Sequence, residues 1–538
     1  MNHSLFATPA TYQQFLDPVV LSHANRRWVI NFMELLNARR FEALQALVQP
    51  QWLAFEGNTL SDWGLELAWP HLDLRRSDLL EPAAAWAQAY PQSFAAQIFA
   101  ARLQCSVAWE ARGTATSDRT SEKQFAVMQQ HFDAAYPYLH RALGLSSRPT
   151  LAIAVGLAMT RAGQNDPSHD YEELAQGHLP HSPLLYRWMM WALQPKWGGS
   201  TEAMSSLFEA AKGWGKSWNE HDRAQVQIRY DDEMADVAAC SGEPEHALEM
   251  LRNIARSAPD QGAIHSHLAS RYNANDDTHL AIDHMLQAVK IAPAAQRLYP
   301  LGNYFHQIGR TEQSLAYLEE SMLWGSGAAA GDMMESLRDQ FSRASPGDRP
   351  MWEAQITEVA RHGLQQYSSD TMFVLGCIEY FHRDDAQAKH RAYGWWQQAA
   401  DWGHSVAMFN LGVSHFDGDD GLPVNKSLGL DLLNQAAAQG SWKANRRLGH
   451  LYLHGDGVQQ DDVRAAYHLE FAAEGEDVRA MREWVFCLWF GRGTPKDRDA
   501  ANAILDRLKV LDPDEYKRAR DEIGWGAAIK NIFRNLLP

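Results

Sequence analysis

Cysteine is scarce in this chain: four residues among 538, namely Cys105, Cys240, Cys377 and Cys487. Consecutive cysteines are more than a hundred residues apart, and none forms a C-x-x-C pair. The sequence therefore predicts neither a disulfide framework nor a cysteine zinc site. We expect buried thiols in a reducing compartment, and hence a cytoplasmic protein.

Positive charge and long apolar runs are also in short supply. Lys and Arg total 49 against 66 for Asp and Glu, giving a net charge of -17, which repels phosphate backbones and anionic headgroups. The longest apolar stretch, residues 151–159, is shorter than the roughly 20 residues that cross a bilayer, and it predicts a buried helix. The first 25 residues lack a basic residue followed by an apolar run, so no secretory signal is expected.

Motifs of catalysis are missing from the sequence. There is no G-x-S-x-G, H-E-x-x-H, Walker loop or G-x-G-x-x-G, so we expect no enzyme and no cofactor. Histidine is frequent, at 23 residues, and His450 and His454 lie one helical turn apart. Neither has a third ligand nearby in the sequence, and no metal site is predicted.

What the chain does have is repeats. Two alanines and a proline recur after 34 residues, the tetratricopeptide period: Ala235, Ala247 and Pro259 are followed by Ala269, Ala281 and Pro293. The next unit is weaker because Pro300 falls where its first helix should already be running. We expect that helix to start late or to bend.

A second array has a longer period. Gly376, Gly412 and Gly449 are 36 and 37 residues apart, and alanine pairs followed by glycine predict close helix packing and a C-cap. Residues 444–475 (ANRRLGHLYLHGDGVQQDDVRAAYHLEFAAEG) resemble the Sel-one-like repeat nearly throughout. That resemblance implies antiparallel helix pairs and, by analogy, an adaptor role.

The amino-terminal third is rich in tryptophan. Two of its segments, AWEARG at residues 108–113 and LQPKWGGS at 193–200, resemble a bacterial family known as domain of unknown function 4034, with which no activity is associated. The first segment is typical of a helix end with a glycine cap, and the second of a helix stop, a tight turn and an N-cap at Ser200. The alternative is a small-molecule or peptide pocket; its candidate residues are Trp109, Glu110, Arg112 and Trp197.

A binding groove is the main functional hypothesis. Counting by analogy with tetratricopeptide helices, some side chains should line the concave side of the repeats. They are Phe409, Arg446, His450, His454, Arg482, Phe486 and Phe490 in the second array, and Tyr299 and Asn303 in the first. Arg suits carboxylates and aromatic rings supply anchor area, so an acidic and aromatic peptide would fit. The alternative is that these residues pack against an adjacent turn of the superhelix.

The sequence as a whole predicts an all-α protein, an α-solenoid of tetratricopeptide and Sel-one-like helix pairs after a Trp-rich helical domain. The Gly- and Pro-rich stretches 325–331 and 345–350 indicate a module boundary. The expected parts are an N-terminal segment (1–25), the Trp-rich domain (26–225), tetratricopeptide-like repeats (226–345), Sel-one-like repeats (346–511) and a capping helix (512–538).

The expected function is a scaffold or adaptor with a protein or peptide partner, without nucleic acid or membrane insertion. Two alternatives remain open. One is an enzyme or ligand-binding protein with its pocket in the amino-terminal domain. The other is a bacterial toxin-neutralising or secretion-associated adaptor, for which the repeats are the only sign.

Overall fold

The computed structural model describes residues 23–69, 74–112, 120, 122–161, 166, 168–214, 218–382, 387–418 and 422–536. All regular elements in these ranges are helices, and no β-strand occurs among them. The all-α prediction is therefore confirmed. The chain divides into two compact units, unit 1 with residues 1–114 and 122–371, and unit 2 with residues 115–121 and 372–538.

Unit 1 begins with a bundle whose core is aromatic. Its helices are α3 (Ala24–Asn37), α4 (Phe41–Glu56), α5 (Asp62–Ala68), α6 (Leu80–Ala89), α7 (Phe94–Arg112), α8 (Glu122–Leu145) and α9 (Thr150–Arg161), with a short 3-10 turn η2 (Ser77–Leu79). Trp69, Trp86, Phe32 and Phe99 are fully buried there. Helix α9 contains the apolar stretch 151–159, whose side chains are nearly all buried, as predicted.

Three further helices, α10 (Tyr171–His178), α11 (Pro183–Ala192) and α12 (Thr201–Trp214), are joined by the 3-10 turns η4 (Leu179–His181) and η5 (Pro195–Trp197). The segment LQPKWGGS forms the predicted stop: α11 ends before Pro195, and Gly198 adopts a positive φ of 87°. The Ser200 hydroxyl accepts the Ala203 N–H at 3.2 Å and caps α12.

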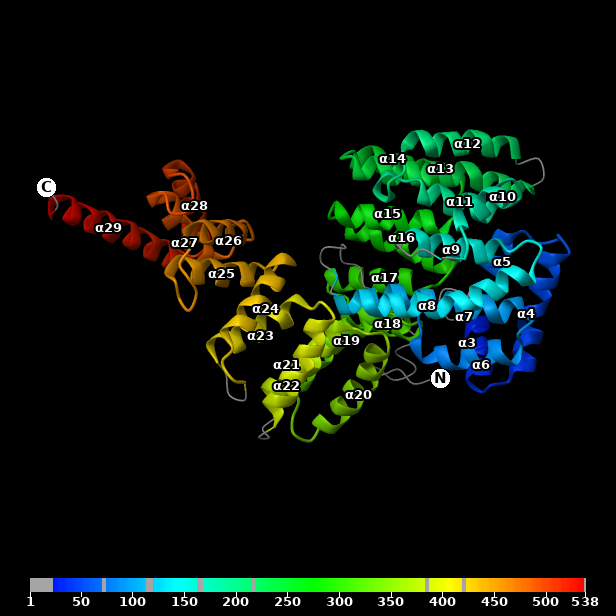
Figure 1. The fold of residues 1–538 in the computed structure, drawn as a ribbon, viewed down its shortest axis with the longest axis horizontal. Helices are drawn as coiled ribbons and strands as arrows, with labels where there is room; N and C mark the ends of the chain where they lie inside the picture. Colours follow the sequence, from blue (N-terminus) through cyan, green and yellow to red (C-terminus); the bar gives the residue numbers. More distant parts are fainter. Residues whose placement is uncertain are drawn as a thin grey trace. The chain divides into compact units, whose positions relative to one another are not determined.

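Helix pairs follow in unit 1: α13 (Glu220–Cys240) with α14 (Pro244–Ser257), α15 (Gly262–Ala274) with α16 (Thr278–Ile291), α17 (Ala295–Gln307) with α18 (Thr311–Leu323), and α19 (Gly327–Arg343) with α20 (Arg349–Gln365). They succeed one another in Figure 1 from α13 and α14 near the top to α19 and α20 below. The repeated alanines, Ala235, Ala247, Ala269 and Ala281, are all buried between helices.

Pro300 and the glycines of 325–331 gave two expectations about this array. Helix α17 begins at Ala295, five residues before Pro300, so it does not start late, and the other expected outcome, a bend at Pro300, stays a prediction. Burial of Leu298 and Leu301 holds the segment helical despite the lost hydrogen bond. Gly327 and Gly331 lie in the first turns of the long helix α19, and the module boundary expected at 325–331 and 345–350 stays a prediction. A Cβ at Gly331 would lie 2.7 Å from the Asp370 Cβ, so glycine allows this close approach.

The amino-terminal bundle packs along the helix pairs of the same unit. The Arg26 guanidinium donates to both carboxylate oxygens of Glu320, at 2.6 and 2.9 Å, and the Glu320 side chain is only 2% exposed. Arg76 donates to the Leu323 carbonyl at 2.9 Å. The boundary drawn at residue 225 lies inside unit 1 and stays a prediction.

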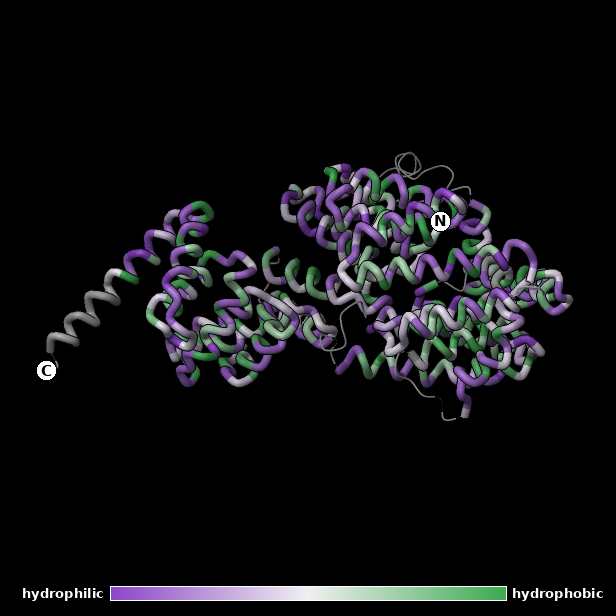
Figure 2. The backbone as a smooth tube through the Cα atoms, turned by 90° about the horizontal axis from the view of Figure 1, so that it is seen from above, coloured by the Kyte–Doolittle hydropathy of each residue, from purple (hydrophilic) through white to green (hydrophobic). Residues whose placement is uncertain are grey.

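Unit 2 consists of repeated helix pairs. We call the first helix of each pair the A helix and the second the B helix. The pairs are α21 (Ser369–His382) with α22 (Ala388–Asp401), α23 (Ser405–Asp417) with α24 (Lys426–Ala438), α25 (Trp442–His454) with α26 (Asp462–Glu474), and α27 (Val478–Phe490) with α28 (Arg498–Leu511); α29 (Pro513–Leu536) follows. The first three residues of α21 belong to unit 1. Along the helices of Figure 2, hydrophilic and hydrophobic stretches alternate, as expected for helices with one buried face.

The caps of the A helices repeat as well. His404, Ser441 and Asp477 each accept the backbone N–H three residues later with their side chains, at 3.1, 3.3 and 2.8 Å. Such capping satisfies one of the free N–H groups at the start of each A helix. Each A helix therefore begins at the same point of its repeat, which keeps its buried alanine opposite the B helix.

The cysteine prediction needs one correction. Cys105, Cys377 and Cys487 are buried free thiols, but Cys240 is exposed. It is the last residue of α13, where the chain turns through Ser241 and Gly242 toward the next helix, so it lies beyond the packed part of the pair.

The fit of A against B helices can be tested at Gly449. A Cβ there would lie 2.7 Å from the Leu469 Cγ and 3.3 Å from its backbone nitrogen. We expect Gly449→Val to lower the opening free energy of α25 and α26 amides by about 1–3 kcal/mol, because overpacking forces the helices apart. Hydrogen exchange of the full chain measures it.

The matched control is Gly394→Val in α22, where an added Cβ meets no atom within 4 Å. Its exchange rates should stay at the wild-type level. Equal effects of the two substitutions would contradict the packing argument.

Candidate functional site

The predicted groove residues of unit 2 lie on successive A helices. We define the A-helix face as the surface formed by Arg446, His450 and His454 of α25 and by Arg482, Phe486 and Phe490 of α27. The two sets are 36 residues apart in sequence. The fold brings them together, since the His450 Nδ1 lies 2.8 Å from the Glu483 Oε1.

Aromatic rings occupy equivalent positions on this face. The rings of His450 and His454 are 4.5 Å apart between centroids, and those of Phe486 and Phe490 are 4.9 Å apart. His450, Phe486 and Phe490 are partly exposed and His454 is exposed. The A-helix face therefore offers two neighbouring ring pairs that solvent or a ligand can reach.

The cations of the face already have carboxylate partners within the protein. The Arg446 Nε lies 3.2 Å from the Asp477 Oδ2. The Arg482 guanidinium pairs with Glu515, at 2.9 Å, and with Glu522, both on α29. The face is thus closer to electrically neutral than Arg446, His450 and Arg482 alone would indicate.

Sequence reasoning missed these carboxylates. Asp477 is only 7% exposed and also caps α27, and the side chains of Glu483 and Glu515 are 9% and 7% exposed. A signal for Asp477 existed, because it stands 36 residues after the cap Ser441. Glu483 and Glu515 gave none, since their pairing depends on how neighbouring repeats are rotated.

Glu483 also supplies the third group that the two histidines lacked. His450, His454 and Glu483 each offer a ligand atom within 4.8 Å of the others. Burial lowers the pKa of His454, and the neighbouring His450 adds to the shift, so His454 favours the neutral form that metals bind. However, the Arg482 Nη2 lies 3.6 Å from the Glu483 Oε1, the oxygen that also contacts His450. The positive charge of Arg482 opposes the binding of a metal cation there.

The other three predicted groove residues, Phe409, Tyr299 and Asn303, belong to other helices than the A-helix face. Phe409 is partly exposed on α23, one repeat before α25. In unit 1, Tyr299 and Asn303 share one side of α17. Burial raises the pKa of Tyr299 to about 12, with a contribution from the Asp332 carboxyl, and burial raises the pKa of Asp332 itself. These three polar side chains interact with one another.

The four residues of the proposed amino-terminal pocket lie in two elements of unit 1: Trp109, Glu110 and Arg112 at the end of α7, and Trp197 in η5. The Trp109 ring contacts Phe132 edge-on at 6.2 Å, and the Arg112 guanidinium lies over Trp109. Glu110 accepts the Gly327 N–H at 3.0 Å and pairs with Arg75 at 3.1 Å.

Trp197 instead contacts the ring of Trp191 at 5.1 Å and lies near the Lys196 ammonium. Glu110 thus joins the bundle to α19. A pocket shared by all four residues stays a prediction.

A buried charge cluster in unit 1 also escaped the sequence analysis. The Asp232 carboxylate, 2% exposed, lies 2.6 Å from the His267 Nδ1 and 2.9 Å from the Arg229 Nη1. The negative charge of Asp232 raises the pKa of His267. Burial alone would raise the pKa of Asp232, but His267 and Arg229 outweigh it and the net shift is downward.

Comparisons with known proteins identify part of the chain. The family model described as Sel1 repeat matches residues 369–404, 405–441, 442–477 and 480–505, which fall on α21 to α28. The prediction of Sel-one-like repeats is therefore confirmed. No curated protein matches the chain significantly by sequence, and the resemblance to family 4034 stays a prediction.

Solved structures give only distant matches. A Sel1 repeat protein from Oxalobacter formigenes is 18% identical over 63% of this chain and 93% of its own, with a TM-score of 0.38. c5321, a protective antigen of uropathogenic Escherichia coli with an SLR fold, is 19% identical over 83% and 90%, with a TM-score of 0.37. Human IFIT1, in a dimer with m7Gppp-AAAA, is 13% identical over 76% and 94%, with a TM-score of 0.39. TM-scores this low support no inference about ligand or activity.

The hydropathy of the helices adds one finding. Within the described ranges, every helix is too short or too polar to span a membrane.

The pairing of Arg482 with α29 yields a prediction. Arg482→Gln removes the charge that faces the nearly buried Glu515 and Glu483, and we expect it to lower the opening free energy of α29 by about 2–4 kcal/mol. Hydrogen exchange of α29 amides in the full chain measures this. Arg518→Gln is the matched control: Arg518 pairs with the same Glu515 at 2.6 Å but is 65% exposed, so its loss should cost at most about 1 kcal/mol. Similar effects of both changes would refute a special role for Arg482.

The Asp232 and His267 pair yields a pH prediction. A raised His267 pKa stabilises the fold below the unfolded value of about 6.5, and this is lost as pH rises through the folded pKa. The lowered Asp232 pKa stabilises above about 4, and this is lost as pH falls. His267→Gln should therefore lower the melting temperature of unit 1 more near pH 5.5 than near pH 9. The corresponding loss in free energy of unfolding should be about 1 kcal/mol, because His267 is 48% exposed. Calorimetry of the full chain tests it, with the exposed His279→Gln as the control. A pH-independent difference would exclude the pair.

Proposed function

We propose that this protein is a scaffold whose A-helix face binds an extended segment of a partner protein, with Phe486 and Phe490 as the main contact. The chain carries Sel1 repeats, and such repeats generally act as protein-interaction scaffolds. Binding, and not catalysis, is therefore the role that we assign to this face. The kind of segment that binds does not follow from the repeats alone, and we infer it from the rings and charges of the A-helix face.

The observation that carries the proposal is the ring pair on α27. Phe486 and Phe490 lie one helical turn apart, their rings are in tilted contact with centroids 4.9 Å apart, and both are partly exposed. Aromatic side chains lose little conformational entropy on binding, because they have only two side-chain torsions, and they are enriched among energetically dominant interface residues. The histidine ring pair of α25 extends the same surface by one repeat.

The charges of the face define the kind of segment. Arg446 and Arg482 are engaged with Asp477, Glu515 and Glu522, so an incoming carboxylate must compete with carboxylates already in place. Apolar contact with the rings should therefore contribute more than ion pairing. The segment we expect carries an aromatic or aliphatic anchor, with acidic residues in a minor role.

Selection from a displayed library of random peptides tests the proposal. The full-length wild type should enrich peptides with an aromatic or aliphatic anchor, and fluorescence anisotropy of a synthetic copy should give its affinity. Phe486→Ala with Phe490→Ala should weaken binding by at least about 30-fold, since removal of one dominant anchor costs about 2 kcal/mol.

The matched control for this test is Tyr467→Ala. Tyr467 is 67% exposed on the B helix α26, so it removes a ring from a different surface. Its affinity should match that of the wild type. Enriched peptides that bind the double variant as tightly as the wild type would refute the A-helix face as the binding site.

A further inference from the structure

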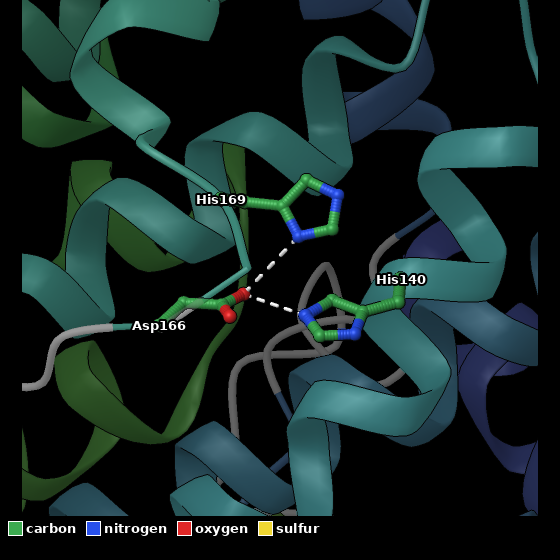
Figure 3. A group of neighbouring side chains, drawn as sticks. All are labelled: His140, Asp166 and His169. Atoms are coloured by element: carbon green, nitrogen blue, oxygen red, sulfur yellow. Dashed lines mark hydrogen bonds and ion pairs between the residues drawn. The ribbon is translucent and has the colours of Figure 1, made fainter.

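Three potential ligand side chains meet in unit 1, whereas the repeats that carry the proposed function belong to unit 2. His140 lies near the end of α8, and Asp166 and His169 lie in the connection between α9 and α10. Figure 3 shows both imidazole rings directed toward the Asp166 carboxylate, from two sides. Each residue offers a ligand atom within 4.8 Å of the others.

The distances converge on one carboxylate oxygen. The His140 Nε2 lies 2.6 Å from the Asp166 Oδ2, and the His169 Nδ1 lies 3.5 Å from the same atom. The rings of His140 and His169 are 4.5 Å apart between centroids. Two imidazole nitrogens and one carboxylate oxygen therefore surround a small volume, which is the ligand set of many protein sites for Zn²⁺ and related ions.

Neighbouring groups hold the carboxylate in place. Asp166 has a side chain that is only 1% exposed. The Tyr171 hydroxyl donates to its Oδ2 at 2.8 Å, and the Ser168 backbone N–H donates to its Oδ1 at 2.8 Å. Outer hydrogen bonds of this kind orient ligands in metal sites and tune their affinity.

The same hydrogen bonds keep Asp166 ionised. Burial alone would raise its pKa, but hydrogen bonds from His140, Ser168 and Tyr171 lower it, and the net shift is downward. A buried carboxylate that stays charged is a suitable ligand for a cation.

One atom of the cluster has no hydrogen-bond partner among the described residues. The His169 Nδ1 is buried, and none of the described residues makes a hydrogen bond with it. It faces the Asp166 Oδ2 at a distance too long for a hydrogen bond. A buried polar atom without a partner is costly, and a cation between this nitrogen and the carboxylate would satisfy it.

The cluster is also accessible. A cavity of about 450 Å³ is lined by Asp166, His169, Tyr171 and two further acidic residues, Asp170 and Glu172. The cavity gives an ion an entry path and leaves room for a water ligand. The added negative charge attracts cations.

We propose that His140, Asp166 and His169 bind a divalent transition-metal ion of the zinc class, with solvent from the cavity completing its coordination. The ion links the end of α8 to the connection between α9 and α10.

The alternative is that His140 and Asp166 only form a hydrogen bond and bind no metal. In that case the His140 Nε2 carries a proton, whereas metal binding requires the neutral tautomer with the proton on Nδ1. Ligand atoms around Zn²⁺ lie about 2.0–2.2 Å from the ion and so about 3.3 Å from one another. The 2.6 Å contact must open by less than about 1 Å, which a partly exposed His140 can accommodate.

Equilibrium dialysis of the chelator-treated full chain against ZnCl₂, with metal analysis, tests this inference. The wild type should retain a single high-affinity Zn²⁺, and His169→Gln should weaken its binding by more than about 100-fold, because a ligand is lost and not only a supporting group. His169 is 32% exposed, and circular dichroism should show an unchanged fold.

The matched control is the double variant His450→Gln with His454→Gln, which removes the other cluster of potential ligands. It should retain the high-affinity Zn²⁺. Loss of that ion in the control together with its retention in His169→Gln would overturn the proposal, as would a wild type that binds no Zn²⁺ at all.

A measurement on the unmodified protein removes the dependence on variants. Added ZnCl₂ should protect His140 and His169 from modification by diethylpyrocarbonate, while exposed histidines such as His279 remain reactive. Equal reactivity of His140 and His169 with and without Zn²⁺ would contradict the assignment.

Discussion

The closeness of approach between paired helices is the constraint on which this structure depends. In the Sel1 repeats, Gly449 faces Leu469 so closely that any added Cβ would clash. The same relation recurs in unit 1, where a Cβ at Gly302 would lie 2.8 Å from the Leu318 Cγ. Small residues at these positions let the A and B helices of a pair bury a continuous interface, and each pair then stacks on the next.

This stacking also determines the surface. Once Ala444, Leu448 and Gly449 turn toward the B helix, the helical period leaves Arg446, His450 and His454 on another side of α25. The next A helix repeats the arrangement 36 residues later. An A-helix face with rings in register is thus a consequence of repeat packing, and its chemistry can vary from repeat to repeat without disturbing the core.

The architecture was predictable because its signals are local. A fixed spacing of small residues, a capping side chain and a glycine after the second helix are all visible within one repeat. The same holds for the turn at residues 193–200 and for the buried helix at 151–159. The prediction was wrong at Cys240, and of the two outcomes expected for α17 the late start did not occur. Both results depended on packing around a single residue. Burial of Leu298 and Leu301 outweighs the cost of Pro300.

The sequence by itself thus determined the helical class, the two repeat periods and the positions of the candidate side chains on their helices. Only the tertiary structure decided which charges neutralise one another and which potential metal-binding side chains lie close together. Glu483 reaches His450 from the next repeat, and Asp166 reaches His140 across 26 residues. The reason is physical: a side-chain pair between helices depends on their relative rotation and separation, and no single stretch of sequence encodes either.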